Sequence, residues 1–173
     1  MLAYGMSEFK LSDTMDIDVE TAKKIIDNFF KVVPDVNKFL TMLGNLGKKN
    51  GYIRTNGVYR RIRNFPEWLE AKENNDFKVF GNIERASKNT PIQGTNADIV
   101  KLALINIQNI IWENKYPIKL ILSIYDEIQS ECPREFAEEW KEIMNIEMVK
   151  AAQIVIKSIP IVVDCKISEC WEK

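Results

Sequence analysis

The chain has 173 residues, of which 46% are hydrophobic and 28% are charged, and its 24 basic side chains nearly balance its 25 acidic ones. This composition is that of one ordinary domain with a sizeable core, and it excludes a disordered acidic segment and a histone-like polycation. The sequence contains no histidine, which excludes Ser-His-Asp, Cys-His and HExxH chemistry. Any catalysis must therefore use carboxylates, Lys, Tyr, Cys or a metal ion held by oxygen.

The chain carries no targeting or spanning segment that its sequence reveals. It has no run of about 18 apolar residues, and its N-terminus lacks the basic-then-apolar layout of a signal peptide. Its three cysteines, Cys132, Cys165 and Cys170, form no CxxC pair and cannot all pair with one another, which fits a reducing compartment. We therefore predict a soluble protein of the cytoplasm with no membrane partner.

The first part of the chain predicts two helices. Asp18 is a suitable N-cap for a helix whose apolar residues, as far as Phe30, share one face. Pro34 suits the first turn of a second helix, and Gly51 is a suitable residue to end it.

A hairpin and a loop are predicted next. Residues 52–65 carry Tyr, Ile and Val around Asn56-Gly57, which is a typical turn between two antiparallel strands. Residues 66–80 are polar, and we predict a loop there. A long helical pattern then runs from about Asn82 to Asn114, and Pro91 should kink it because proline removes one backbone hydrogen bond.

The last part of the chain predicts strands and one more helix. Ile118–Ile124 and Ile128–Cys132 alternate as strands, and Pro133 opens a long helix after them. A final strand is predicted at Ile161–Ile167. The predicted fold class is α+β, with long helices packed on one face of a small antiparallel sheet.

The turn between the two central strands holds the adjacent carboxylates Asp126 and Glu127, preceded by Tyr125. Ionised carboxylates must be solvated, paired or bound to a cation. A hard ion such as Mg²⁺ takes one or two carboxylates together with substrate phosphates, which this turn would suit. The simpler alternative is a solvated hairpin tip.

Three planar polar side chains, Arg85, Asn89 and Gln93, are spaced i, i+4 and i+8 and so share one face of the long helix. Their donors suit the acceptors that all base pairs share in the minor groove of a duplex. An ordinary solvated helix face is the alternative, and spacing alone favours that alternative.

A basic stretch precedes that helix. From Lys48 to Arg63 the chain has six basic residues and no acid, and aromatic residues such as Tyr52 and Tyr59 alternate with them. Such a segment would bind a phosphate backbone. A solvated hairpin is the commoner explanation for such a run.

Three motifs together resemble family A DNA polymerases, the relatives of bacterial DNA polymerase I. The segment Tyr4-Gly5-Met6-Ser7 is similar to the YGMS that ends the family's fingers helix. The segment from Glu84 to Ile99 resembles the family's ERAxxNxPxQGTxADI helix, and Leu122–Ile128 resembles its C-terminal strand-turn-strand motif. The three motifs come in the family's order and at about its spacing.

The resemblance implies a fragment of the right-hand polymerase architecture, comprising the end of the fingers and the palm over residues 1–173. It implies that Asp126 is the second metal-binding aspartate and that Glu127 assists it near the primer terminus, in a mechanism that uses two Mg²⁺ ions. Tyr125 stands where the family usually has histidine, so a phenol would make any contact with the primer. Tyr4 would lie at the insertion site beside the templating base.

The resemblance also assigns the DNA contacts. Arg85, Asn89 and Gln93 would follow the minor groove of the newly made duplex, and Arg60 and Arg61 would contact its backbone. The implied partners are primer-template DNA and deoxynucleoside triphosphates. Residues of the Ile, Lys and Asn types make up about a third of the chain, which is typical of an A·T-rich genome, whether of a bacteriophage or a bacterium.

Several family features lie upstream of this segment and are absent from the sequence: the first aspartate motif DYSxIELR, the basic fingers residues, the thumb and the exonuclease domain. We therefore expect the chain alone to be inactive and to need the N-terminal half of a polymerase. A non-catalytic DNA-binding remnant and, less favoured, a Mg²⁺-dependent nuclease are the alternatives. We also expect the incomplete palm sheet to expose an apolar edge that promotes self-association.

Overall fold

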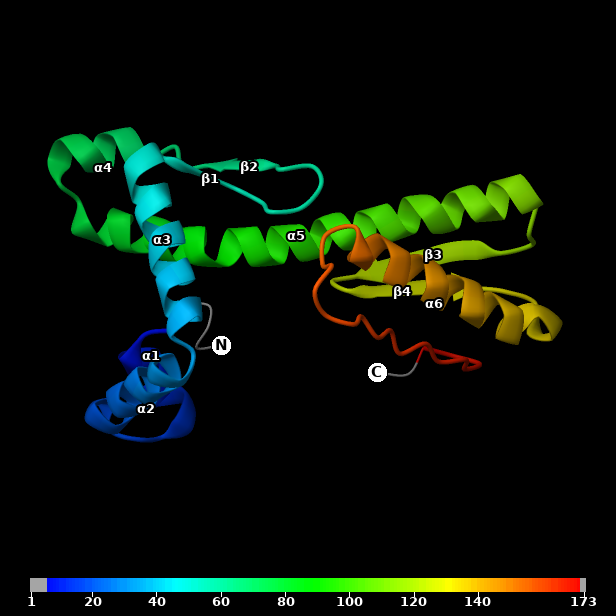
Figure 1. Cartoon of the computed structure of the whole chain (residues 1–173), viewed down its shortest axis with the longest axis horizontal. Helices are drawn as coiled ribbons and strands as arrows, with labels where there is room; N and C mark the ends of the chain where they lie inside the picture. Colours follow the sequence, from blue (N-terminus) through cyan, green and yellow to red (C-terminus); the bar gives the residue numbers. More distant parts are fainter. Residues whose placement is uncertain (1–5, 172–173) are drawn as a thin grey trace. The chain divides into compact units, whose positions relative to one another are not determined.

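A computed structural model describes residues 6–171, which form two compact units (Figure 1). The first unit contains the chain up to Thr55 together with Arg61–Gln93, and the second contains Asn56–Arg60 together with the chain from Gly94 onward. Helix α5 (Phe77–Asn114) contributes its first part to one unit and its second part to the other. Its backbone is helical through the buried Pro91.

The first unit is mainly helical, and the side chains at its helix ends explain where those helices begin and stop. The Asp18 carboxylate accepts a hydrogen bond from the Thr21 amide at 2.8 Å, which confirms the predicted N-cap, and the Thr21 hydrogen bonds lower the pKa of Asp18. Gly51 ends the next helix with a φ of 74°, a left-handed conformation that glycine adopts without strain. The elements are α1 (Glu8–Met15), α2 (Val19–Val32), α3 (Pro34–Asn50), β1 (Tyr52–Arg54), β2 (Ile62–Asn64) and α4 (Trp68–Asn74).

The loop predicted at residues 66–80 is wrong. Helix α4 lies within it, and α5 begins at Phe77, before the predicted start. Packing explains the difference, because Ala71 is buried and the Trp68 indole donates to the Lys48 carbonyl oxygen at 2.7 Å. Such contacts between distant segments stabilise a short helix that its polar sequence does not predict.

The interior of the first unit combines a small apolar cluster with a close helix crossing. Leu43, Ile53, Phe65 and Ile83 form the cluster. Beside it α3 meets α5 so closely that a Cβ at Gly47 would lie 1.8 Å from the Ser87 hydroxyl oxygen. The crossing therefore requires a residue without a side chain at position 47.

The second unit packs two helices against a two-stranded sheet. Its elements are the second part of α5, β3 (Lys119–Ile124), β4 (Glu127–Glu131), the 3-10 turn η2 (Arg134–Phe136) and α6 (Ala137–Gln153). Strands β3 and β4 are antiparallel, with Leu120 opposite Ser130 and Leu122 opposite Gln129, so that Ile121 occupies an irregularity in the ladder. The α+β fold class with small antiparallel sheets is thus confirmed.

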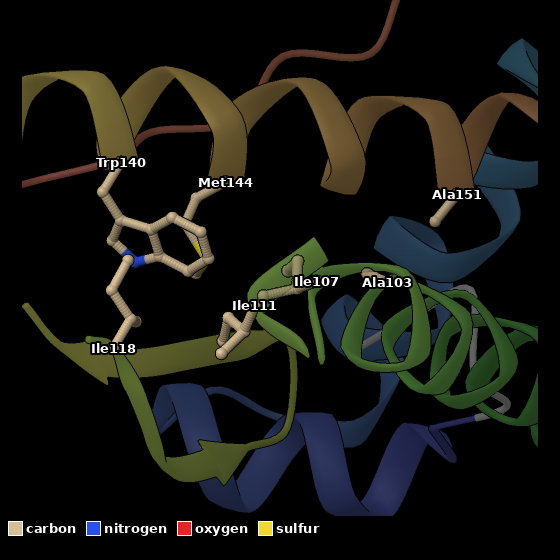
Figure 2. Close-up of a cluster of buried hydrophobic side chains, with 7 residues drawn as sticks. All are labelled: Ala103, Ile107, Ile111, Ile118, Trp140, Met144 and Ala151. Carbon is tan, nitrogen blue, oxygen red and sulfur yellow. The ribbon is translucent and has the colours of Figure 1, made fainter. Parts of the chain in front are cut away.

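Side chains from α5 and α6, together with Ile118 just before β3, form the larger apolar core of the molecule (Figure 2). Figure 2 shows Ile107 and Ile111 of α5 facing Trp140 and Met144 of α6. Trp140 is 3% exposed, and its indole donates to the Ser130 hydroxyl at 2.7 Å, so the largest side chain of the core leaves no buried donor unpaired. The buried members are Ala103, Ile107, Ile111, Ile118, Trp140, Met144 and Ala151.

The prediction of a final strand at Ile161–Ile167 is wrong, although half-buried and exposed side chains alternate there as they would in a strand. Residues 161, 163 and 165 are half-buried and residues 162, 164 and 166 are exposed, which is the alternation of a strand. The segment forms no ladder with β3 or β4 in the described residues. Side chains hold it instead, because Asn145 donates to the Val163 carbonyl oxygen at 3.5 Å and Cys165 packs against the core.

The sheet exposes apolar side chains on β3. Ile121 is 62% exposed and Leu122 is 41% exposed. Within residues 6–171 no helix combines the length and apolar character that crossing a bilayer requires.

Candidate functional site

The acidic turn (Tyr125–Glu127) lies at the end of the β3–β4 hairpin in the second unit. The pairing of Ile124 with Glu127 leaves Tyr125 and Asp126 as the two turn residues. Tyr125 has a φ of 53° and is 90% exposed. A left-handed conformation costs a non-glycine residue about 1–2 kcal/mol, and residues held in this way are often found at functional sites. The turn therefore displays a strained tyrosine next to two exposed carboxylates.

The two carboxylates of the turn differ in their surroundings. Oε1 of Glu127 accepts hydrogen bonds from the Gln129 amide at 2.7 Å and from the Trp171 indole at 3.2 Å. Asp126 is exposed on the turn itself. Sequence reasoning missed Trp171, because its contact with the turn joins residues 44 positions apart and no local pattern signals it.

The donor set of the acidic turn consists of two adjacent carboxylates. Two adjacent carboxylates are the number of protein ligands that Mg²⁺ commonly takes, with waters and substrate phosphates completing its shell. No group of three or more Cys, Asp or Glu side chains able to hold a metal comes together in residues 6–171. The turn thus offers two carboxylate groups, which no third acidic or cysteine side chain of residues 6–171 joins in such a group.

The predicted polar stripe lies on the part of α5 that belongs to the first unit. Arg85 and Gln93 are exposed, and Asn89 lies half-buried between them in sequence. The Asn89 side-chain oxygen is buried and accepts no hydrogen bond from the described residues. Arg85 donates to the Asn82 side chain at 2.5 Å, which tethers the guanidinium near its own helix. The stripe thus presents donors on the helix surface.

Other residues of the same motif, Glu84 and Ser87, contact helix α3. Glu84 accepts from Lys48 at 2.6 Å and from Lys88 at 2.7 Å, and the hydrogen bonds from Lys48 and then Lys88 lower its pKa. Ser87 is fully buried at the crossing with Gly47. These two motif residues therefore join α5 to α3, and sequence reasoning assigned neither of them this role because the partner helix is 36 or more residues away.

The predicted backbone-binding arginines lie in the loop after β1. Arg60 and Arg61 are both exposed, and Arg60 has a φ of 44°. The Arg61 amide donates to the Thr55 hydroxyl at 3.0 Å, which holds the backbone of the loop. Nearby, Arg63 donates to the Thr90 hydroxyl of α5 at 3.0 Å.

The tip of this hairpin docks on α5 within the second unit. The Asn56 amide donates to the Thr95 hydroxyl at 3.1 Å, and a Cβ at Gly57 would lie 2.6 Å from a carboxylate oxygen of Asp98. Asp98 is 2% exposed. The motif residues Thr95 and Asp98 thus contact the tip of a hairpin about 40 residues earlier in the chain. The sequence alone did not predict this packing role.

The structure brings the predicted residues together in two sets. Arg85, Asn89 and Gln93 share one helix face in the first unit, and Tyr125, Asp126 and Glu127 share one turn in the second. Tyr4 lies outside the described residues.

Comparison with known proteins defines the class to which this fold and these motifs belong. The model of the family described as DNA polymerase family A matches residues 1–173. The chain belongs to this family, whose members are generally dependent on divalent metal ions. The family assignment inferred from the three motifs is thereby confirmed.

The particular relatives are bacterial polymerases. The chain is 30% identical over 170 residues to DNA polymerase I of Streptococcus pneumoniae and 31% identical over 170 residues to that of Caldicellulosiruptor bescii. Each match covers 98% of this chain but only 18% or 19% of the relative, so the chain spans about a fifth of their length. A solved structure of the POL domain of Pol1 from M. smegmatis, in complex with DNA primer-template and dNTP, superposes with a TM-score of 0.77 and 31% identity over 87% of this chain and 25% of its own.

Proposed function

We propose that the chain is the C-terminal palm-and-fingers part of a template-directed DNA polymerase, which adds deoxynucleotides to a primer during DNA replication. The observation that carries the proposal is the acidic turn: a chain of this family displays two adjacent carboxylates on a strained, exposed hairpin turn. The M. smegmatis relative was solved with DNA primer-template and dNTP, which supports the same partners here.

Asp126 and Glu127 are the residues that would hold Mg²⁺. Their oxygen donors suit this ion, and the triphosphate of a nucleotide would supply further ligands. The chemistry that such ions would supply there is activation of the primer 3′-hydroxyl and stabilisation of the leaving pyrophosphate. The chain would place the two carboxylates on one hairpin, where the exposed phenol of Tyr125 would be able to donate a hydrogen bond at the primer terminus.

The remaining predicted residues would bind the duplex. Arg85, Asn89 and Gln93 would donate to minor-groove acceptors, which every base pair presents and which therefore check shape rather than sequence. Arg60 and Arg61 are exposed cations that would contact the phosphate backbone. Tyr4 is assigned the insertion site by resemblance alone.

Activity would require a second polypeptide or segment that carries the first aspartate motif. The turn offers two carboxylates, and within residues 6–171 no third acidic or cysteine side chain groups with them. The same observation favours one alternative, a DNA-binding remnant that retains the helix face and the basic hairpin without catalysis. We place the protein in the cytoplasm of a bacterial or phage-infected cell, since the relatives above are bacterial polymerases.

Primer extension in the presence of Mg²⁺ tests the proposal. The chain is assayed alone and mixed with a polypeptide that carries the upstream part of a family A polymerase, including DYSxIELR. We expect extension in the mixture only, and Asp126→Asn should reduce it by at least about 100-fold because the substitution removes a charged metal ligand.

The matched control is Asp164→Asn, which removes another exposed carboxylate of the second unit and should leave extension unchanged. Extension by the chain alone would contradict the need for a second half. Absence of extension in the mixture, with binding of primer-template retained, would establish the DNA-binding remnant instead.

A further inference from the structure

The C-terminal segment (residues 161–171) of the described chain ends at the acidic turn. It has no regular secondary structure, but contacts fix it along its length. Asn145 donates to Val163, Cys165 packs on the core, and Glu169 pairs with Arg134 at 2.5 Å. Its Trp171 indole then donates to Glu127 at 3.2 Å.

Taken in sequence order, these contacts connect the segment first to the core and then to the acidic turn. The Arg134–Glu169 pair is 88% and 86% exposed at its two side chains, so it contributes little free energy to holding the segment. Cys165, whose pKa is raised by desolvation, packs against the core earlier in the segment. These contacts lead the segment to the acidic turn, where Trp171, which is 54% exposed, makes its hydrogen bond to Glu127.

Trp171 and Gln129 both donate to the same oxygen of Glu127. The Gln129 amide lies 2.7 Å from Oε1 and the Trp171 indole lies 3.2 Å from it. A carboxylate with one oxygen held by two donors cannot rotate freely, and hydrogen bonds to a charged acceptor are the stronger kind. Oε2 is then the oxygen that remains for a ligand.

We propose that Trp171 is a positioning residue for Glu127: together with Gln129 it holds Oε1 and so presents Oε2 to a cation or substrate at the acidic turn. The proposal rests on the proposed function of the turn, and it adds a residue that none of the three polymerase motifs contains. Partners that orient a metal ligand commonly change metal affinity or activity by about 10- to 100-fold when they are removed.

The first test measures the contact itself, in the complete chain and without polymerase activity. The chain has four tryptophans, so an ¹H–¹⁵N spectrum shows four indole signals, and Trp171→Phe identifies that of Trp171. We expect Glu127→Gln to move the Trp171 indole signal, because it replaces a charged acceptor with a neutral one. Asp126→Asn, which changes the neighbouring charge, should move it far less.

The matched control in this test is Trp112, which is 68% exposed on α5. Its indole signal should stay in place in both variants. A Trp171 signal that Glu127→Gln leaves unchanged would overturn the proposal, since the two side chains would then not be in contact.

The second test uses the reconstituted polymerase mixture. Trp171→Phe keeps the ring and removes the donor, and it should lower kcat by about 10-fold while KM for nucleotide and binding of primer-template stay the same. Trp171→His restores a ring N–H and should recover part of the loss. Trp112→Phe should have wild-type kinetics.

The two tests separate failure of this inference from failure of the proposed function. If the mixture is active and Trp171→Phe leaves its kcat unchanged, the positioning role is overturned. A mixture that is inactive with the wild-type chain would refute the proposed function, and the indole signal would then decide alone whether Trp171 holds Glu127.

Discussion

The two units of the molecule stabilise themselves in different ways. The first has a cluster of four buried apolar residues, supplemented by a close helix crossing at Gly47 and Ser87 and by the Lys48–Glu84–Lys88 ion pairs. The second has a larger apolar core, centred on Trp140, between α5, α6 and the sheet. The first unit therefore depends on specific polar and small residues, and the second depends on burial of large apolar ones.

Within the first unit, a single motif contains both residues that pack helices together and residues that stay exposed on the surface. In the motif of α5, Glu84 and Ser87 maintain the crossing with α3, whereas Arg85 on the same helix stays exposed. In the second unit the motif residue Asp126 is exposed and adds nothing to the core. Matching a family motif therefore does not by itself assign a residue to catalysis or DNA binding.

The largest effect is expected from the core of the second unit. Trp140→Ala removes the biggest buried side chain and leaves the Ser130 hydroxyl without its donor, so the free energy of unfolding should fall by about 3–5 kcal/mol. Urea unfolding followed by far-UV circular dichroism measures it. Trp112→Ala removes an exposed tryptophan of the same unit and should change stability by less than about 0.5 kcal/mol. Equal effects of the two substitutions would contradict the assigned core.

A smaller effect is expected at the helix crossing of the first unit. Gly47→Ala places a methyl group within 1.8 Å of the Ser87 oxygen and 2.7 Å of its Cβ, so the helices must separate and stability should fall by about 1–3 kcal/mol. Gly81→Ala is the matched control, because a Cβ there meets nothing within 4 Å. Since alanine favours a helix, this control should gain about 0.5–1 kcal/mol. If both variants lose stability, the close crossing is not what constrains Gly47.

The smallest effect is expected from the ion pairs at Glu84. Its pKa is lowered in the folded chain, so its contribution to stability is present above its ordinary value of 4.5 and is lost as the pH falls through the folded pKa. Glu84→Gln should therefore cost less than about 1 kcal/mol at neutral pH, and the difference from the wild type should vanish once the pH falls below the folded pKa of Glu84. Thermal unfolding measured from pH 7 to pH 3 checks this, with Glu113→Gln on the same helix as the control for loss of one charge.

Local signals in the sequence predicted most of the secondary structure. The N-cap at Asp18, the stop at Gly51 and the strands on either side of Tyr125 are where the pattern placed them, because capping, left-handed glycine and alternation are properties of a few neighbouring residues. Motif spacing also located the acidic turn and the polar stripe.

The features that the sequence did not predict depend on distant partners. Helix α4 is stabilised by a bond from Trp68 to α3, and the segment at 161–167 has the alternation of a strand without a neighbour to pair with. The contact of Trp171 with Glu127 likewise joins residues that no local pattern connects. Whether such a segment has a neighbouring element to pair with depends on tertiary packing, and the spacing of hydrophobic residues along the chain does not predict that packing.

The crossing of α3 and α5 has a consequence for how this family segment can diverge. Because the Gly47 backbone lies against the Ser87 side chain, the two positions share one small volume. A larger residue at 47 would be accommodated without separating the helices if position 87 became glycine. The two positions should therefore covary among relatives that retain both helices, which makes them a coupled pair in evolution although they lie 40 residues apart in sequence.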